Sequence, residues 1–119
     1  MKILNTELEF DFNDADDMER LENAIEETQK ALNDMITDNK KVSETIRETC
    51  ENIFNCIDKI FGVGTHNKIF GNKVNLNMCI DAFKDLIDAR IEQDNKLTEE
   101  LNNIEKKYSP NRATRRNKK

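Results

Sequence analysis

The sequence predicts a mainly α-helical protein with an N-terminal β-hairpin, three long helices and one short helix. Three observations predict this fold class. Apolar residues recur at steps of three and four along three long stretches, the spacing of one face of an α-helix. Apolar and acidic residues alternate near the N-terminus, as in a half-buried strand. All three glycines lie within residues 62–71 and the single proline is residue 110, so no helix breaker interrupts the long stretches.

A chain of 119 residues has the length of one domain. We expect a helical domain at residues 1–108 and a flexible basic tail at residues 109–119. The tail holds five of the 19 basic residues and none of the 24 acidic ones, so its net charge is +5 and that of the rest is −10. The chain contains no apolar run of the roughly 20 residues that a membrane helix needs. No signal peptide is visible either, and we expect a cytoplasmic protein.

Residues 2–12 are predicted to form the hairpin. Ile3 and Leu4 belong to a short first strand, and Asn5 and Thr6 to the turn. The second strand has its apolar residues on one face: Leu8, Phe10 and Phe12. A two-stranded hairpin is only marginally stable alone. Its apolar face must therefore lie on a helix or on another copy of the chain, which makes these three residues candidates for self-association.

The first helix is expected to begin after Asn13 or Asp14, either of which can cap it, and to end near Asn39. Its apolar stripe comprises Met18, Leu21, Ile25, Thr28, Leu32, Met35 and Ile36. The second helix has Ser43 as a candidate cap and Gly62 as its C-terminal residue, because glycine tolerates a positive φ. Its stripe, the most apolar of the chain, comprises Ile46, Cys50, Ile53, Phe54, Ile57, Ile60 and Phe61. We expect it to form the centre of the core.

A short helix is predicted from Thr65, as its cap, to Phe70, with Gly71 ending it. The third long helix begins near Asn75. Its first stripe comprises Leu76, Cys79, Ile80, Phe83, Ile87 and Ile91. Pro110 stops any helix that reaches it.

After Glu92 the apolar spacing thins to a 3-4 pattern like that of a coiled coil. The residues concerned are Leu97, Leu101, Ile104 and Tyr108. Two arrangements are open: this segment folds back onto the first two helices, or it extends past its own domain and binds a partner.

The basic tail contains Arg112, Arg115 and Arg116. Clustered positive charges bind phosphates with an affinity that falls as salt rises. They also bind acidic protein surfaces, including the body of another copy. A solvated end with no partner is the third interpretation.

Nothing in the sequence indicates catalysis, a metal or a cofactor. The three cysteines lack a CxxC spacing and are expected to be buried free thiols. His66, the only histidine, has no nucleophile at a recognisable spacing. The glycine segment at 62–71 lacks the GK[ST] ending of a phosphate-binding loop and follows a helix, so we interpret it as helix punctuation. The acidic run at 14–17 lacks the spaced ligands of a calcium loop. We expect a protein that is not an enzyme.

Three segments resemble a known family: LEFDFNDADDMERLE at 8–22, IFGVGTHNKIFGNKVNL at 60–76 and YSPNRATRR at 108–116. The family is that of small tail-assembly-chaperone-like proteins of tailed phages and prophages of Gram-positive bacteria. The resemblance spans nearly the whole chain. It is strongest in the junction at 61–71 and in the end at 109–116.

The resemblance implies a non-catalytic protein in the cytoplasm of the bacterial host. It implies that the protein binds the helical tape-measure protein or the tail-tube protein and keeps it competent for assembly. It also implies a homo-oligomer. The alternative is a small phage-encoded regulator or inhibitor that binds nucleic acid or a host protein. No helix-turn-helix and no basic surface with interleaved aromatic residues is visible, so we do not expect nucleic acid to be the main partner.

Overall fold

The computed structural model of the protein describes residues 1–37 and 39–108. It is mainly helical, as the sequence predicts, with a short antiparallel strand pair at the N-terminus. The elements are β1 (Lys2–Ile3), β2 (Thr6–Glu7), α1 (Ala15–Asp34), the 3₁₀ turn η1 (Met35–Thr37), α2 (Val42–Phe61), α3 (Thr65–Phe70) and α4 (Leu76–Tyr108). The predicted basic tail at 109–119 lies outside the described residues.

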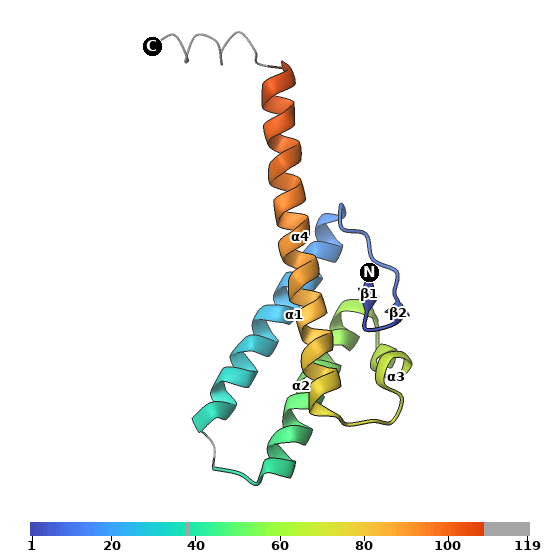
Figure 1. Ribbon diagram of the computed structural model, residues 1–119, viewed down its shortest axis with the longest axis vertical. Helices are drawn as coiled ribbons and strands as arrows, with labels where there is room; N and C mark the ends of the chain where they lie inside the picture. Colours follow the sequence, from blue (N-terminus) through green and yellow to red (C-terminus); the bar gives the residue numbers. More distant parts are fainter. Residues whose placement is uncertain (38, 109–119) are drawn as a thin grey trace.

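Helices α1 and α2 form an antiparallel hairpin, and the N-terminal half of α4 packs across both (Figure 1). The C-terminal half of α4 continues past the body, so the molecule measures 65 × 32 × 21 Å. The short helix α3 packs against α2, and the strand β1 packs against α4. The turn between α1 and α2 and the C-terminal end of α4 lie at opposite ends of the long axis (Figure 1).

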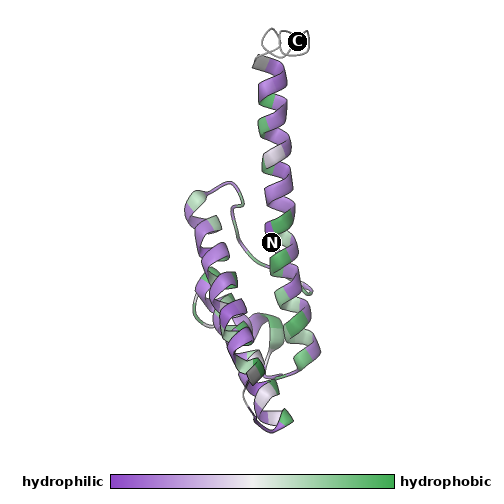
Figure 2. Cartoon of the chain, turned by 90° about the vertical axis from the view of Figure 1, so that its left-hand side faces the viewer, coloured by the Kyte–Doolittle hydropathy of each residue, from purple (hydrophilic) through white to green (hydrophobic). Residues whose placement is uncertain are grey.

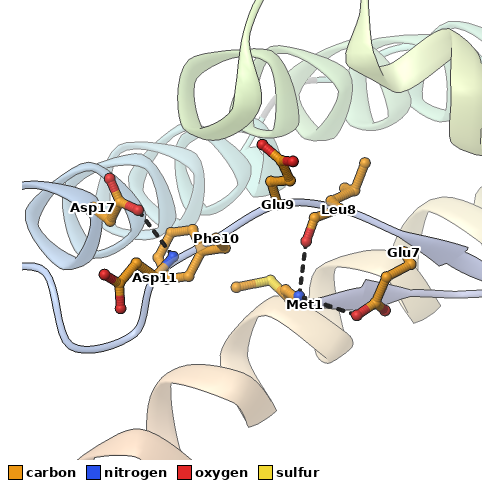
Figure 3. A pocket seen from close by; sticks show the side chains of 7 residues that line it. All are labelled: Met1, Glu7, Leu8, Glu9, Phe10, Asp11 and Asp17. Atoms are coloured by element: carbon orange, nitrogen blue, oxygen red, sulfur yellow. Dashed lines mark hydrogen bonds and ion pairs between the residues drawn. The ribbon is translucent and has the colours of Figure 1, made fainter.

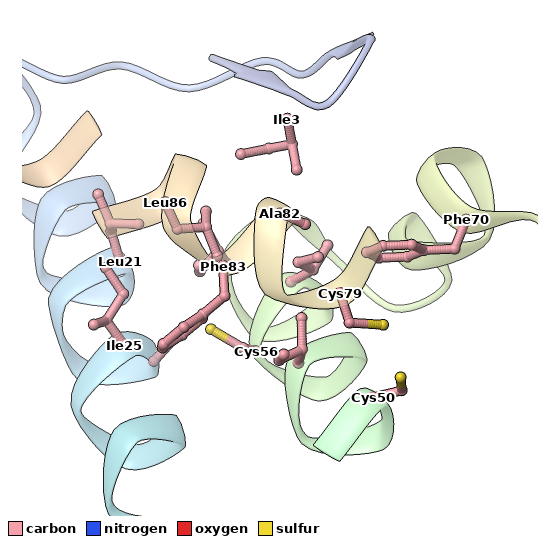
Figure 4. Packing of buried hydrophobic residues seen from close by; sticks show 14 residues of the cluster. Ile3, Leu21, Ile25, Cys50, Cys56, Phe70, Cys79, Ala82, Phe83 and Leu86 are labelled. Carbon is pink, nitrogen blue, oxygen red and sulfur yellow. The ribbon is translucent and has the colours of Figure 1, made fainter. Parts of the chain in front are cut away.

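One apolar cluster joins β1 and the four α-helices (Figure 4). The predicted stripes supply much of it, and Ile3 of β1 closes it from above. Cys56, Ala82 and Leu86 are also buried although no predicted stripe included them, whereas Ile91 of the third stripe is 52 % exposed. Its fully buried side chains are Ile3, Leu21, Ile25, Cys50, Ile53, Cys56, Ile57, Cys79 and Leu86. The three cysteines are free and buried, as expected. The core thus comes from the periodic apolar residues of three helices, because each helix has one face that must leave water.

The N-terminal hairpin is present, but two of its predicted details are wrong. The turn consists of Leu4 and Asn5, whereas Thr6 is already paired with Ile3. Leu4 adopts φ +52, and its N–H donates to Asp85 Oδ2 of α4 at 2.8 Å. This long-range bond and the burial of Ile3 place the turn, and neither can be read from local sequence.

The second strand is also shorter than predicted, since it ends at Glu7. Leu8 still exchanges two backbone bonds with Met1, at 2.7 and 2.8 Å, and residues 9 to 11 run on without strand pairing. The predicted alternation nevertheless holds as a pattern of burial. Leu8, Phe10 and Phe12 are half-buried, whereas the acidic residues between them are exposed. The apolar face therefore lies on the protein's own helices.

The ends of α1 and α2 differ from prediction at their connection. Asp14 caps α1, as predicted, and accepts the N–H of Asp17 at 3.0 Å. The α-helix then ends at Asp34 and continues as η1, short of the predicted end near Asn39. Helix α2 starts after Lys41, which has extended geometry and no side-chain cap. Ser43 lies inside the first turn of α2 and is not its cap.

The short helix has the predicted bounds but a different cap. Gly64, with φ +88, precedes the helix, and Thr65 is its first residue. The Thr65 hydroxyl is buried and donates to the carbonyl oxygen of Gly62 at 2.7 Å. It therefore bonds to the end of α2 instead of capping α3. Gly71 ends α3 with φ +63, as predicted.

Helix α4 decides between the two arrangements proposed for its C-terminal segment. The side chain of Asn75 accepts the N–H of Met78 at 3.0 Å, which confirms the predicted start. The helix then runs for 33 residues without a break and does not fold back (Figure 1). No glycine or proline lies between residues 76 and 108, so no local signal is present for a turn.

Replacing Gly62 by alanine is expected to lower the free energy of unfolding by about 1–3 kcal/mol. Gly62 has φ +117 and ψ 152, a conformation that only glycine adopts readily. An added Cβ would lie 4.0 Å from Thr65 Oγ1, so backbone strain and not crowding causes the loss. Urea unfolding followed by circular dichroism measures it. Val63→Ala, one residue away and 99 % exposed, is the control and should change nothing. Equal midpoints for both variants would contradict the strain argument.

Candidate functional site

The most unusual surface of the protein is the free part of α4, residues 92–108, which we call the α4 extension. Leu97 is 49 % exposed, Leu101 57 % and Ile104 53 %. They follow one another at four and three residues, so they lie along one side of the helix. Green apolar patches interrupt the purple helix in Figure 2 along this part. Three large apolar side chains in a row are thus left to water.

The stripe begins at a hollow where α4 leaves the body. The hollow has a volume of about 510 Å³ and is lined by Phe12, Met18 and Leu97 together with charged residues. Glu22 of α1 and Arg90 of α4 form an ion pair across it, with 3.9 Å between Oε2 and Nε. Leu97 therefore lies beside the end of the body, whereas the rest of the stripe is not among the residues that line the hollow.

A second apolar surface lies at the opposite end of the molecule, and we call it the hairpin-end groove. Its volume is about 430 Å³, and α1, η1, α2 and α4 all line it. Leu32, Ile53 and Phe83 form much of its apolar floor, and Ile36 at its edge is 78 % exposed. The sequence places Ile36 on the core stripe of the first helix, but the chain leaves that helix before it, and Ile36 points away from the core. No local pattern indicates this groove.

The candidates for self-association lie at the N-terminal segment. Leu8 and Phe10 pack against the core, and the Phe10 ring meets that of Phe61 edge to face at 6.0 Å. Phe12 lines the hollow beside α4. These side chains thus pack largely against other residues of the same chain. Their role in self-association stays a prediction.

A shallow depression of about 650 Å³ runs along the same segment (Figure 3). The Met1 ammonium donates to the Leu8 carbonyl oxygen at 2.8 Å. Asp17 accepts the N–H of Asp11 at 2.9 Å and a bond from Arg20 at 2.6 Å. The Asp11 N–H, and then Arg20, hold the pKa of the Asp17 carboxyl below its usual value, since both favour the charged form. The bond between Asp11 and Asp17 attaches the segment to α1.

The structure brings His66 and Asp58 together, a pair that the sequence does not indicate. His66 Nδ1 lies 2.9 Å from Asp58 Oδ2, and Asp58 Oδ1 accepts the His66 backbone N–H at 3.0 Å. The imidazole stacks on Phe54 with 4.8 Å between ring centroids. All three contacts join α3 to α2. This geometry explains the pair as a structural link between the two helices.

The remaining predicted partner-binding residues lie at or beyond the end of α4. Tyr108 is the last residue of α4. Arg112, Arg115 and Arg116 lie outside the described residues. Within residues 1–37 and 39–108, no three His, Cys, Asp or Glu side chains are grouped so that they could hold a metal ion. None of the described helices is long and apolar enough to cross a membrane.

Comparison with known proteins identifies a family but no characterised relative. No curated protein and no solved structure matches the chain significantly. One family model matches, and it covers residues 4–119, which include every element described above except the first strand's Lys2 and Ile3. The chain therefore belongs to the family described as "Family of unknown function (DUF6673)".

Proposed function

We propose that the protein is a non-catalytic helix-binding protein that acts as a tail-assembly chaperone of a phage or prophage. The observation that carries this proposal is the exposed stripe of Leu97, Leu101 and Ile104 on a helix that extends past its own domain. An amphipathic helix of this kind binds other helices through its apolar side. The resemblance of three segments to tail-assembly-chaperone-like proteins suggests which helix is bound. The client is the tape-measure protein or the tail-tube protein.

The size of the stripe suits a chaperone that must release its client. Completing the burial of a half-exposed leucine contributes on the order of 1 kcal/mol. Three such side chains give a few kcal/mol, from which the cost of association is subtracted. The resulting affinity is moderate, so a growing tail tube can displace the chaperone. The charged residues between the stripe positions keep the uncovered helix in solution.

The basic tail adds contacts of a different kind in this proposal. Arg112, Arg115 and Arg116 bind acidic residues of the client or of another copy. Surface charge pairs of this type weaken as salt rises. Deleting residues 109–119 should therefore reduce client binding at low salt and make little difference at high salt.

The test is a pull-down from phage-producing cells, with and without nuclease, followed by mass spectrometry. The tag belongs at the C-terminus behind a long linker, because the Met1 ammonium is bonded to Leu8. Leu101→Glu places a charge in the stripe and should reduce capture of the client at least tenfold. Asn102→Glu places the same charge one position away, off the stripe, and should not.

Capture of tape-measure or tube protein that resists nuclease and depends on Leu101 supports the proposal. Two results would overturn it. One is loss of every partner on nuclease treatment, which favours a regulator that binds nucleic acid. The other is capture of a host factor alone.

A further inference from the structure

The two uncovered apolar surfaces of this protein have complementary shapes. The hairpin-end groove is concave and is lined by three helices. The α4 extension is a single helix with one apolar side. They lie at opposite ends of the long axis (Figure 1). Within one copy they cannot meet, because α4 is a continuous helix.

The groove has the shape of an unfinished helical bundle. Leu32 comes from α1, Ile53 from α2 and Phe83 from α4, so three helices surround it and a fourth side is open. In a four-helix bundle the fourth position is taken by a helix whose apolar side faces the other three. Leu97, Leu101 and Ile104 form such a side.

We propose that the α4 extension of a second copy fills the hairpin-end groove, and that the contact is reciprocal. Two copies then lie antiparallel about a two-fold axis, and each extension occupies the other copy's groove. An antiparallel neighbour allows both contacts at once, because groove and extension lie at opposite ends. Such a contact closes after two copies, whereas a parallel head-to-tail contact would continue as an open chain.

Length and charge fit this occupant. At 1.5 Å per residue, the extension is about 25 Å long, enough for several turns in the groove. Over its whole length, residues 92–108, it carries five acidic residues and three basic ones, a net charge of −2, and two of the basic residues lie in its last turn. Lys84 is the one charged side chain among the described residues that line the groove. A helix with a net negative charge therefore meets a groove whose one charged lining side chain is positive, and this favours the pairing over a partner of like charge.

The inference does not depend on the chaperone function. It does predict that the dimer and the client-bound protein exclude each other, because the client and the second copy bind the same stripe. A client helix that takes the extension must open the dimer. The dimer is thus the state in which the stripe is covered until a client arrives.

Analytical ultracentrifugation of the full chain tests the dimer. The wild type should have twice the mass of one 13.9 kDa chain. Leu101→Glu in the extension and Ile36→Glu at the groove should each raise the dimer dissociation constant at least tenfold. Both positions are exposed in the single copy, so neither change should unfold it. Asn102→Glu and Val63→Glu carry the same charge elsewhere and should remain dimeric.

A mixture of the two disruptive variants tests the reciprocal contact. The Ile36→Glu variant has an intact extension, and the Leu101→Glu variant has an intact groove. An equimolar mixture should therefore regain a heterodimer with one good contact, at an affinity between those of the wild type and the single variants. Pairing of two extensions with each other predicts no such rescue and no effect of Ile36→Glu.

Three results would overturn the proposal: a monomeric wild type, an Ile36→Glu variant that dimerises like the wild type, or assemblies larger than two. The client pull-down distinguishes failure of the dimer proposal from failure of the proposed chaperone function. Ile36→Glu should still capture the client, because its stripe is unchanged, whereas Leu101→Glu should lose both activities.

Discussion

Shortening Leu86 to alanine is expected to lower the free energy of unfolding by about 2–5 kcal/mol. Leu86 is fully buried on α4, in the cluster that joins this helix to α1 and α2 (Figure 4). The change removes apolar contacts and leaves a cavity that the packed helices cannot fill. Most domains of this size have a total stability of only about 5–15 kcal/mol. The variant should therefore unfold at a much lower urea concentration, as followed by circular dichroism.

Leu101→Ala is the matched control, because it makes the same chemical change on the same helix. Leu101 is 57 % exposed and lies on the α4 extension. In dilute solution, where any dimer is dissociated, its loss should cost less than about 0.5 kcal/mol. If both variants lost the same stability, α4 would be packed along its whole length, contrary to the structure.

The three cysteines are expected to react with a thiol reagent at least about a thousandfold more slowly in the native protein than in urea, at pH 8. Cys50, Cys56 and Cys79 are all buried. Burial raises the pKa of Cys56 and of Cys79, and the neighbouring Cys50 raises that of Cys79 further. A reagent thus has no access to the three thiols until the core opens, and the raised pKa leaves less thiolate at Cys56 and Cys79. Absorbance of the released chromophore counts the thiols. A thiol that reacts as fast in the native state as in urea would contradict this packing.

The same thiols make stability depend on alkaline pH. The pKa of Cys56 and Cys79 is higher in the folded chain than the ordinary value of 9.0. As the pH rises past about 9, the unfolded chain releases these protons first, and unfolding becomes easier. The stability linked to these thiols is complete below that pH and is lost as the pH rises toward the folded-state values. In Cys79→Ala, the urea midpoint should fall less between pH 8 and pH 10 than in the wild type.

Of the two apolar surfaces that form the candidate site, the stripe on the α4 extension was predictable from the sequence and the hairpin-end groove was not. The stripe of Leu97, Leu101 and Ile104 is visible in the sequence, because a helical period needs no knowledge of other segments. The hairpin-end groove is not visible, since its lining comes from residues 32–36, 45–53 and 80–84, which only folding brings together. Ile36 illustrates the difference. Its spacing predicts a core residue, yet the helix changes to a 3₁₀ turn just before it and leaves it exposed.

The errors within the fold concern two caps and one turn. Ser43 and Thr65 are good cap residues by type, but Ser43 lies inside the first turn of α2 and Thr65 is the first residue of α3, so neither is the N-cap. The Thr65 hydroxyl bonds to Gly62, and the hairpin turn at Leu4 bonds to Asp85 of α4, 81 residues away. Cap and turn preferences are worth about 1 kcal/mol, which is also the size of the net contribution of one hydrogen bond, so a single bond elsewhere is enough to change them.

The sequence by itself determined the helices, their apolar faces, the buried thiols and the glycines between α2 and α4. These features depend on periodicity and on local backbone preferences, which act over a few residues. Only the tertiary structure decided that α4 continues past the body and that α1 and α2 leave a groove at their far end. Both depend on where the packing of three helices stops, and that is set by contacts between segments distant in the chain. A helix can bury its apolar side only where a neighbour reaches, so the two surfaces left open are a property of the assembled fold.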